Sequence, residues 1–102
     1  AVKANPFLMV EFYAPWCKHC QNLGPEYAAA SVALRDHRPP VRLAAVDSTD
    51  DNLREIAAEF EVKSFPTMRI FRDGDAKTSE KYDGPRYKDG IVKELSRLAK
   101  GE

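Results

Sequence analysis

Residues 14–20 of the chain read Ala-Pro-Trp-Cys-Lys-His-Cys, and they follow an apolar run and precede a stretch with helical spacing. Cys17 and Cys20 are the only cysteines of the chain. Their position predicts that a strand delivers Cys17 to the start of a helix, where unpaired backbone N–H groups and the helix dipole favour negative charge. A thiolate at Cys17 is therefore stabilised, and it becomes a good attacking and leaving group. The stretch predicts a strand-to-helix junction that carries redox chemistry.

Length and composition fit one compact domain. The chain has 102 residues, of which 43% are hydrophobic, so we expect residues 1–102 to form a single domain. Sixteen basic residues balance sixteen acidic ones, which argues against binding to nucleic acid or to a membrane surface. No apolar stretch approaches the ~20 residues of a membrane span, and no targeting signal is visible. Two cysteines are too few for a disulfide scaffold, so we expect them to do chemistry.

Strand and helix patterns alternate along the first half of the chain, which predicts an α/β fold. The almost wholly apolar run 7–13 predicts a central strand that is buried on both faces. From Cys17 onward, apolar residues recur at three- and four-residue spacing, which predicts a helix that Pro25 kinks and residues 38–40 end. The next apolar run, 41–47, predicts a second strand that is parallel to the first and joined to it by a right-handed crossover.

The second half of the chain predicts a helix, a hairpin and a last helix. The expected elements are a helix over 53–60 with N-cap residues at 48–51, a strand at 67–72, a turn at 73–75 and an edge strand at 78–82. Gly84 and Pro85 are expected to open the last helix. The apolar stripe of that helix comprises Tyr87, Ile91, Leu95 and Leu98.

Taken together, these motifs resemble the catalytic domain of the protein disulfide isomerases, within the thioredoxin superfamily. The matching segments are 10–20, 25–27, 46–47, 65–67, 70–74 and 82–86. The resemblance implies a thioredoxin fold, with a mixed central sheet flanked by helices. It implies a thiol–disulfide oxidoreductase and isomerase that forms, reduces and reshuffles disulfides in proteins. Lys18 and Ala45 depart from the pattern, because relatives usually have Gly at the first position and often have Lys at the second.

The resemblance also concerns the part of the fold that would precede the first strand. The family's first strand should lie before Ala1, so the chain is expected to be a fragment of a larger multidomain protein that lacks this strand. Residues 1–5 would then be the tail of a helix. The strand over 41–47 would become an unprotected sheet edge, which invites pairing with another chain.

The two cysteines have different expected roles. Cys17 is the proposed nucleophile and should be the more exposed, whereas Cys20 lies one helical turn further on, resolves the mixed disulfide and should be buried with a higher pKa. The disulfide between them is itself the redox centre, so no cofactor is expected. Two other interpretations stay open, namely inert core thiols and half of a zinc site. Only His19 and His37 could complete a zinc site and His19 is poorly placed, so no metal is expected.

Three charged residues near the cysteines are candidates for catalysis. Glu11 is the carboxylate of an apolar strand, so burial should raise its pKa, and the resemblance places it beneath Cys20, where it can exchange a proton. Without a lysine at Ala45, Glu11 should be still harder to ionise; alternatively, it reaches solvent at a sheet end. Lys18 and His19 place positive charge near the thiolate, which makes the disulfide a stronger oxidant. Lys18 alternatively is a solvated surface lysine.

Further candidates follow from the resemblance. Pro66 should follow a cis bond that faces the cysteines and leaves the Phe65 backbone free to pair with substrate; the alternative is a trans proline at a strand start. Arg86 should swing towards the active site and help to ionise the resolving thiol, unless it is an ordinary surface arginine. Trp16 and Phe65 are expected to face substrate, a role that partial core packing does not exclude.

The expected partners are unfolded or misfolded proteins with thiols or disulfides, together with glutathione or an upstream thiol oxidase. The resemblance implies the lumen of the endoplasmic reticulum. Other functions stay open, namely a reductant of thioredoxin type or the thioredoxin-like domain of a sulfhydryl oxidase. Two further alternatives belong to other functional classes, namely a substrate-binding chaperone module and a structural metal-binding domain.

Overall fold

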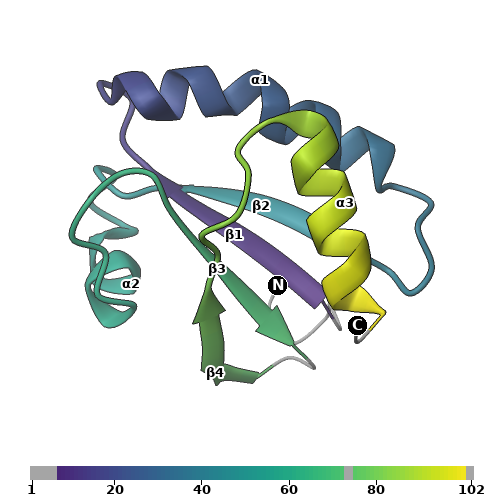
Figure 1. Cartoon of the computed structure of the whole chain (residues 1–102). Coiled ribbons are helices and arrows are strands. Elements are labelled where there is room, and N and C mark those ends of the chain that lie inside the picture. The colour runs from purple at the N-terminus through teal and green to yellow at the C-terminus, as the bar shows by residue number, and fades with distance from the viewer. Residues whose placement is uncertain (1–6, 73–74, 101–102) are drawn as a thin grey trace.

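The central strand predicted from the apolar run is present, and the rest of the fold is arranged around it. The structure is a computed structural model that describes residues 7–72 and 75–100, without the side chains of 75–78. Its elements are β1 (Phe7–Tyr13), α1 (Lys18–Ala33), β2 (Arg42–Asp47), α2 (Arg54–Glu59), β3 (Thr67–Arg72), β4 (Asp75–Lys81) and α3 (Lys88–Ala99). Figure 1 shows α1 and α3 together above the sheet and α2 apart from them.

The sheet is mixed and has the strand order β2-β1-β3-β4. β1 pairs with β2 in parallel and with β3 antiparallel, and β3 pairs antiparallel with β4. This is the thioredoxin fold that the resemblance implied, with the parallel pair and the closing hairpin where the sequence predicts them. Within the described residues β2 is the outermost strand on its side. The residues expected to form the end of a preceding helix, 1–5, lie outside the described part.

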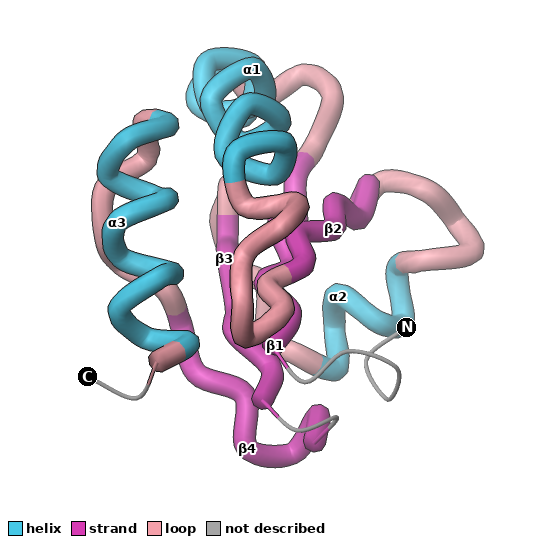
Figure 2. Tube along the Cα trace, turned by 90° about the vertical axis from the view of Figure 1, so that its right-hand side faces the viewer, coloured by secondary structure: helices cyan, strands magenta, loops and turns pink. Residues whose placement is uncertain are grey.

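Two apolar clusters cover the two faces of the sheet. Alternate residues of β1 point to opposite faces, so that Phe7 and Met9 join one cluster and Leu8, Val10 and Phe12 join the other. The first cluster also contains buried residues of α1 and α3, namely Leu23, Tyr27, Ala30, Ile91 and Leu95. The second contains Ala57 of α2 and Phe71 of β3. β1 is therefore buried on both sides, as its composition predicts, and Figure 2 shows the helices on either side of the strands.

The last helix begins later than predicted. Gly84 and Pro85 precede α3 instead of opening it, because the first helical residue is Lys88. The Lys88 backbone N–H donates to the Glu26 carboxylate of α1 at 2.7 Å, so a distant side chain satisfies the helix start. Tyr87, predicted to join the apolar stripe, is 59% exposed.

Four other elements have boundaries that differ from the predictions. Residues 48–51 do not cap α2, since that helix starts at Arg54 and its N-cap residue makes no side-chain hydrogen bond. Their polar groups form local turns instead, as when Asp47 Oδ1 accepts a hydrogen bond from the Thr49 N–H at 2.9 Å. α1 ends at Ala33, before residues 38–40. β2 starts one residue later than predicted, and β4 starts at Asp75 and ends at Lys81. Of the predicted turn at 73–75, residues 73 and 74 lie outside the described part.

Candidate active site

Cys17 lies at the junction between β1 and α1. Its backbone is extended, with φ of −79° and ψ of 119°, and it is the N-cap residue of α1. The Cys17 N–H donates to the Ala14 carbonyl at 3.1 Å, which closes the turn between strand and helix. The Cys17 Sγ accepts a hydrogen bond from the Cys20 N–H at 3.3 Å. The sulfur therefore takes the place of an N-cap oxygen at the positive end of the helix, where a thiolate is stabilised.

Both cysteines are free thiols and both are buried. The exposed fraction is 7% for Cys17 and 6% for Cys20, so the expected greater exposure of Cys17 is almost absent. The reason is that Cys17 packs with Ala14 and Cys20 in a small cluster that Phe65 partly covers. In addition, the Cys17 Sγ–H donates to the Phe65 carbonyl at 3.6 Å. The Phe65 backbone therefore lies directly beside the Cys17 sulfur.

The environment of Cys20 favours its neutral thiol. Burial, followed by the side-chain hydrogen bond with Cys17, raises the pKa of Cys20 to about 11. The charges of Cys17 and Glu11 act in the same direction, and a hydrogen bond to the Ala14 backbone opposes them. This agrees with the sequence prediction. A thiol of this kind needs a base before it can attack.

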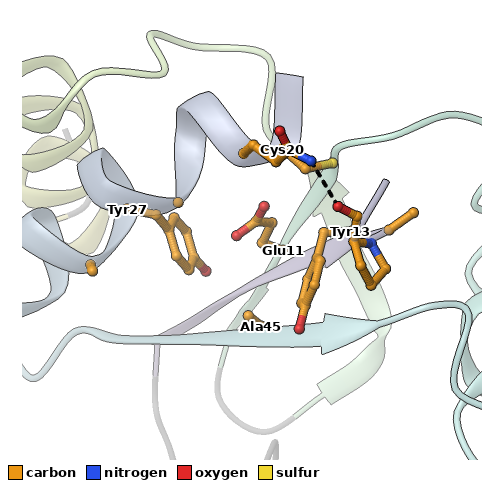
Figure 3. A pocket seen from close by; sticks show the side chains of 10 residues that line it. Glu11, Tyr13, Cys20, Tyr27 and Ala45 are labelled. Carbon is orange, nitrogen blue, oxygen red and sulfur yellow. Dashed lines mark hydrogen bonds between the residues drawn. The ribbon is translucent and has the colours of Figure 1, made fainter. Parts of the chain in front are cut away.

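Glu11 lies in the interior below Cys20. It is 4% exposed, so the alternative in which Glu11 reaches solvent at a sheet end is wrong. Burial raises the pKa of Glu11 to about 7, as the sequence predicts in direction. In β1, Glu11 is opposite Ala45 of β2 and Met68 of β3, neither of which can form an ion pair. Figure 3 shows the carboxyl pointing from β1 towards α1, between Cys20 and Tyr27.

A cavity of about 400 Å³ adjoins this carboxyl. Its walls come from β1, α1 and β2, and Glu11, Cys20 and Tyr27 are among the lining residues (Figure 3). Ala28 of α1 and Ala45 of β2 are exposed at its rim, so the cavity opens to solvent between these two elements. Water thus has access to the Glu11 carboxyl through this cavity.

Tyr27 is a site residue whose contacts sequence reasoning missed, because it treated the residue as core. Its hydroxyl lies 3.0 Å from the Met9 carbonyl and 2.8 Å from the Ala44 carbonyl, so α1 is tied to both β1 and β2. Burial, followed by the charge of Glu11, raises its pKa well above the usual range. The signal was available, since Tyr27 lies seven residues after Cys20 and therefore on the same helix face.

The aromatic residues and Pro66 lie beside Cys17. The Phe65–Pro66 bond is cis, as the resemblance implies, and Pro66 is buried just ahead of β3. Trp16 is 71% exposed, and its ring contacts Phe65 edge to face with 5.7 Å between the centroids. A second cis bond, Arg38–Pro39, was not predicted.

The three remaining cations are at the surface. Lys18 and His19 are exposed in the first turn of α1, between the two cysteines. Arg86 is exposed as well, and it lies two residues ahead of α3 instead of at the helix start. Among the hydrogen bonds and ion pairs of the described residues, none joins these three cations to a cysteine or to Glu11. The structure therefore does not bring the charged groups of these three residues into polar contact with the cysteines.

Comparison with known proteins identifies the family. The family model described as thioredoxin matches residues 1–97. The chain is 50% identical to a protein disulfide-isomerase of Zea mays over 97 residues, which are 95% of this chain and 19% of that protein. It is 54% identical over 98 residues to protein disulfide isomerase-like 1-3 of Oryza sativa subsp. japonica, covering 96% of this chain and 18% of that protein. The chain thus spans about a fifth of the length of these relatives.

A solved structure agrees with this match. The first thioredoxin domain of mouse protein disulfide-isomerase A4 superposes with a TM-score of 0.75 at 34% sequence identity, covering 92% of this chain and 64% of that chain.

The described residues also bear on whether the chain could cross a membrane. Among them, no helix has the length and apolar character needed to cross a bilayer.

Proposed function

We propose that this chain, which belongs to the thioredoxin family, forms, reduces and reshuffles disulfides in protein substrates. Its fold is a thioredoxin-like domain of the protein disulfide isomerase type. The observation that carries this proposal is the position of Cys17. Its sulfur is the N-cap acceptor of α1 and bonds to the Cys20 N–H at 3.3 Å, so attacking and resolving sulfurs are held together. Because the matched relatives are about five times longer, we also propose that this domain is one part of a larger protein.

The reaction begins when the Cys17 thiolate attacks one sulfur of a substrate disulfide. An S–S bond forms to Cys17, and the electron pair of the substrate disulfide leaves on the other substrate sulfur, which takes up a proton. Cys20 then loses its proton and attacks the Cys17 Sγ. This step releases the second substrate thiolate and leaves a Cys17–Cys20 disulfide. The substrate has gained two electrons and the cysteine pair has lost two; the reverse sequence oxidises a substrate dithiol.

Glu11 is the proposed acceptor of the Cys20 proton. A carboxyl with a pKa of about 7 is partly ionised at neutral pH, which suits a general base. It occupies the interior below Cys20, and the adjoining cavity lets water take the proton onward (Figure 3). No cofactor takes part in this scheme, because the two sulfurs carry the electrons.

The surroundings of Cys17 suit an unfolded protein substrate. The exposed Trp16 ring and the Phe65 ring form an apolar platform next to the sulfur. The Phe65 carbonyl and the backbone before Pro66 can pair with an extended substrate strand once the Cys17 thiol has ionised. The exposed Lys18 contributes positive charge in the first turn of α1, between the two cysteines, while His19 and Arg86 stay candidates for the roles predicted from the sequence. We further propose that glutathione or an upstream thiol oxidase resets the pair, in the lumen of the endoplasmic reticulum.

Single cysteine substitutions test this function. Cys17→Ser should reduce insulin reduction and the refolding of scrambled ribonuclease to background, whereas Cys20→Ser should trap mixed disulfides that reductant releases. Asn22→Ser, an exposed change on the same helix, is the matched control and should keep full activity. Unchanged turnover in Cys17→Ser would refute the mechanism. If the doubly substituted chain suppressed aggregation as well as the unchanged chain while no disulfide exchange was measurable in either, a chaperone module would replace the proposal.

A further inference from the structure

The cavity beside α1 is lined by a carboxyl that has no partner within the described part of the chain. Glu11 is almost fully buried, and among the described residues its carboxyl has neither a hydrogen bond nor an ion pair. Its cross-strand neighbour Ala45 ends at a methyl group, and no Lys, Arg or His of the described residues lines the cavity. An ionised carboxyl in such surroundings is costly unless a partner reaches it. Any cation beside Glu11 must therefore enter from outside.

The size and walls of the cavity define what could enter. Its volume of about 400 Å³ falls within the ~300–1,000 Å³ of small-molecule sites. The lining includes the small residues Gly24, Ala28 and Ala45, which keep the entrance between α1 and β2 open. Two of the other polar side chains are already occupied, since the Gln21 side-chain amide donates to the Pro15 carbonyl and the Tyr27 hydroxyl contacts two backbone carbonyls. Tyr13 adds a further hydroxyl to the lining. The cavity thus combines apolar walls with one unpartnered carboxyl.

We propose that this cavity is a binding site for a small organic cation, a primary ammonium on a compact apolar body, whose charged end lies beside the Glu11 carboxylate. The apolar body displaces water from the walls, and the ammonium supplies the missing partner of the carboxyl. This property does not depend on the proposed disulfide chemistry, because neither sulfur needs to react for the ligand to bind.

Binding must then depend on the ionisation of Glu11. The other titratable groups that face the cavity are Cys20 and Tyr27 on α1 and Tyr13 at the end of β1, while β2 contributes only Ala45 to the lining. Burial raises the pKa of Cys20 to about 11 and that of Tyr27 further, so these two stay neutral near pH 7. Glu11, with a pKa of about 7, changes charge in this range. Affinity for an ammonium should fall about tenfold from about pH 8 to about pH 6.

Benzylamine and benzyl alcohol are suitable probes, because they share an aromatic body and differ in charge. Each is titrated into the ¹⁵N-labelled reduced chain, and binding is followed by amide chemical shifts. At about pH 8 benzylamine should bind at least about tenfold more tightly than benzyl alcohol, with the largest shifts at Gly24, Ala28 and Ala45. Equal affinities, no binding of benzylamine, shifts that lie elsewhere, or an affinity that is the same at both pH values would each overturn the proposal.

Three variants locate the site. Glu11→Gln keeps the shape of the side chain but not its charge, so it should reduce the affinity for benzylamine to that for benzyl alcohol. Ala45→Leu should fill the entrance and abolish binding of both probes. Ala33→Leu adds the same atoms at an exposed position of α1 that does not line the cavity, and it should change neither affinity. Retained selectivity in Glu11→Gln, or retained binding in Ala45→Leu, would show that the probes bind elsewhere.

Discussion

The Glu26 carboxylate on α1 accepts a hydrogen bond of 2.7 Å from the backbone N–H of Lys88, the first residue of α3. α3 has no side-chain cap of its own, since its N-cap residue Tyr87 makes no such bond. The distant acid satisfies one of the free N–H groups and complements the positive end of the helix dipole. This bond thereby links the start of α3 to the helix that Cys17 caps, in addition to the apolar packing between the two helices.

Removing this cap should destabilise the chain. Glu26→Ala should lower the free energy of unfolding by about 0.5–2 kcal/mol, which urea denaturation would measure. Glu26→Gln keeps an acceptor oxygen and should recover part of the loss. Glu59→Ala, at an exposed position of α2, serves as the control and should stay within about 0.5 kcal/mol of the unchanged chain. A Glu26→Ala variant as stable as that control would show that the bond contributes nothing.

Tyr27→Phe should lower the stability of the fold by more than the loss of a single oxygen atom suggests. The substitution removes the hydroxyl that lies within 3.0 Å of the buried Met9 carbonyl and of the partly buried Ala44 carbonyl, and an unsatisfied buried group costs about 1–3 kcal/mol. The same change at the exposed Tyr87 should have almost no effect. Equal midpoints for the two variants in thermal unfolding would contradict the role assigned to Tyr27.

The fold could be predicted because its signals are local. The apolar run 7–13 specifies a strand buried on both faces, and the helical spacing after Cys17 specifies α1, so β1 and its neighbours follow from short stretches. The start of α3 could not be predicted, since its cap comes from Glu26, which is 62 residues away. A rule that looks for caps next to a helix places the start at Gly84 and Pro85 instead.

The site was predictable in its chemistry but not in its packing. Glu11 stands out in its apolar strand, so its burial and the direction of its pKa shift follow from sequence. The burial of Cys17 does not, because it depends on Phe65, which approaches from another loop. The cavity likewise needs three separate segments, and no single stretch of sequence contains it.

Glu11 should make stability depend on pH. Its pKa is raised from 4.5 to about 7 in the folded chain, so between these values the unfolded state releases a proton that the folded state keeps. Its contribution to stability is therefore most favourable below about pH 4.5 and falls as pH rises to about 7, by about 3 kcal/mol at roughly 1.4 kcal/mol per pH unit. Glu11→Gln should lack this decline and be more stable than the unchanged chain at about pH 8. Parallel stability curves for the two chains in urea denaturation would contradict the assignment.

Replacing Glu11 should change the rates of the two chemical steps to different degrees. Glu11→Gln removes the proposed base for Cys20 but leaves Cys17 at the helix start, so attack on a substrate disulfide should continue while resolution slows about 10- to 100-fold. Rapid acid quenching and mass analysis would detect the mixed disulfide that accumulates. The slowing should disappear at alkaline pH, where Cys20 ionises without help. Slowing of both steps to the same degree would indicate a packing role instead.

Trp16 should affect substrate binding more than chemistry. Its ring is exposed and contacts Phe65 edge to face, an arrangement that offers a substrate chain an apolar surface beside Cys17. Removing the ring with Trp16→Ala should raise KM for a disulfide-containing peptide several-fold, as expected for the loss of about 1 kcal/mol of aromatic contact, and leave kcat within about twofold. Val32→Ala, an exposed apolar residue near the other end of α1, is the control and should change neither constant. A fall in kcat at constant KM would mean that Trp16 acts on the sulfur and not on the substrate.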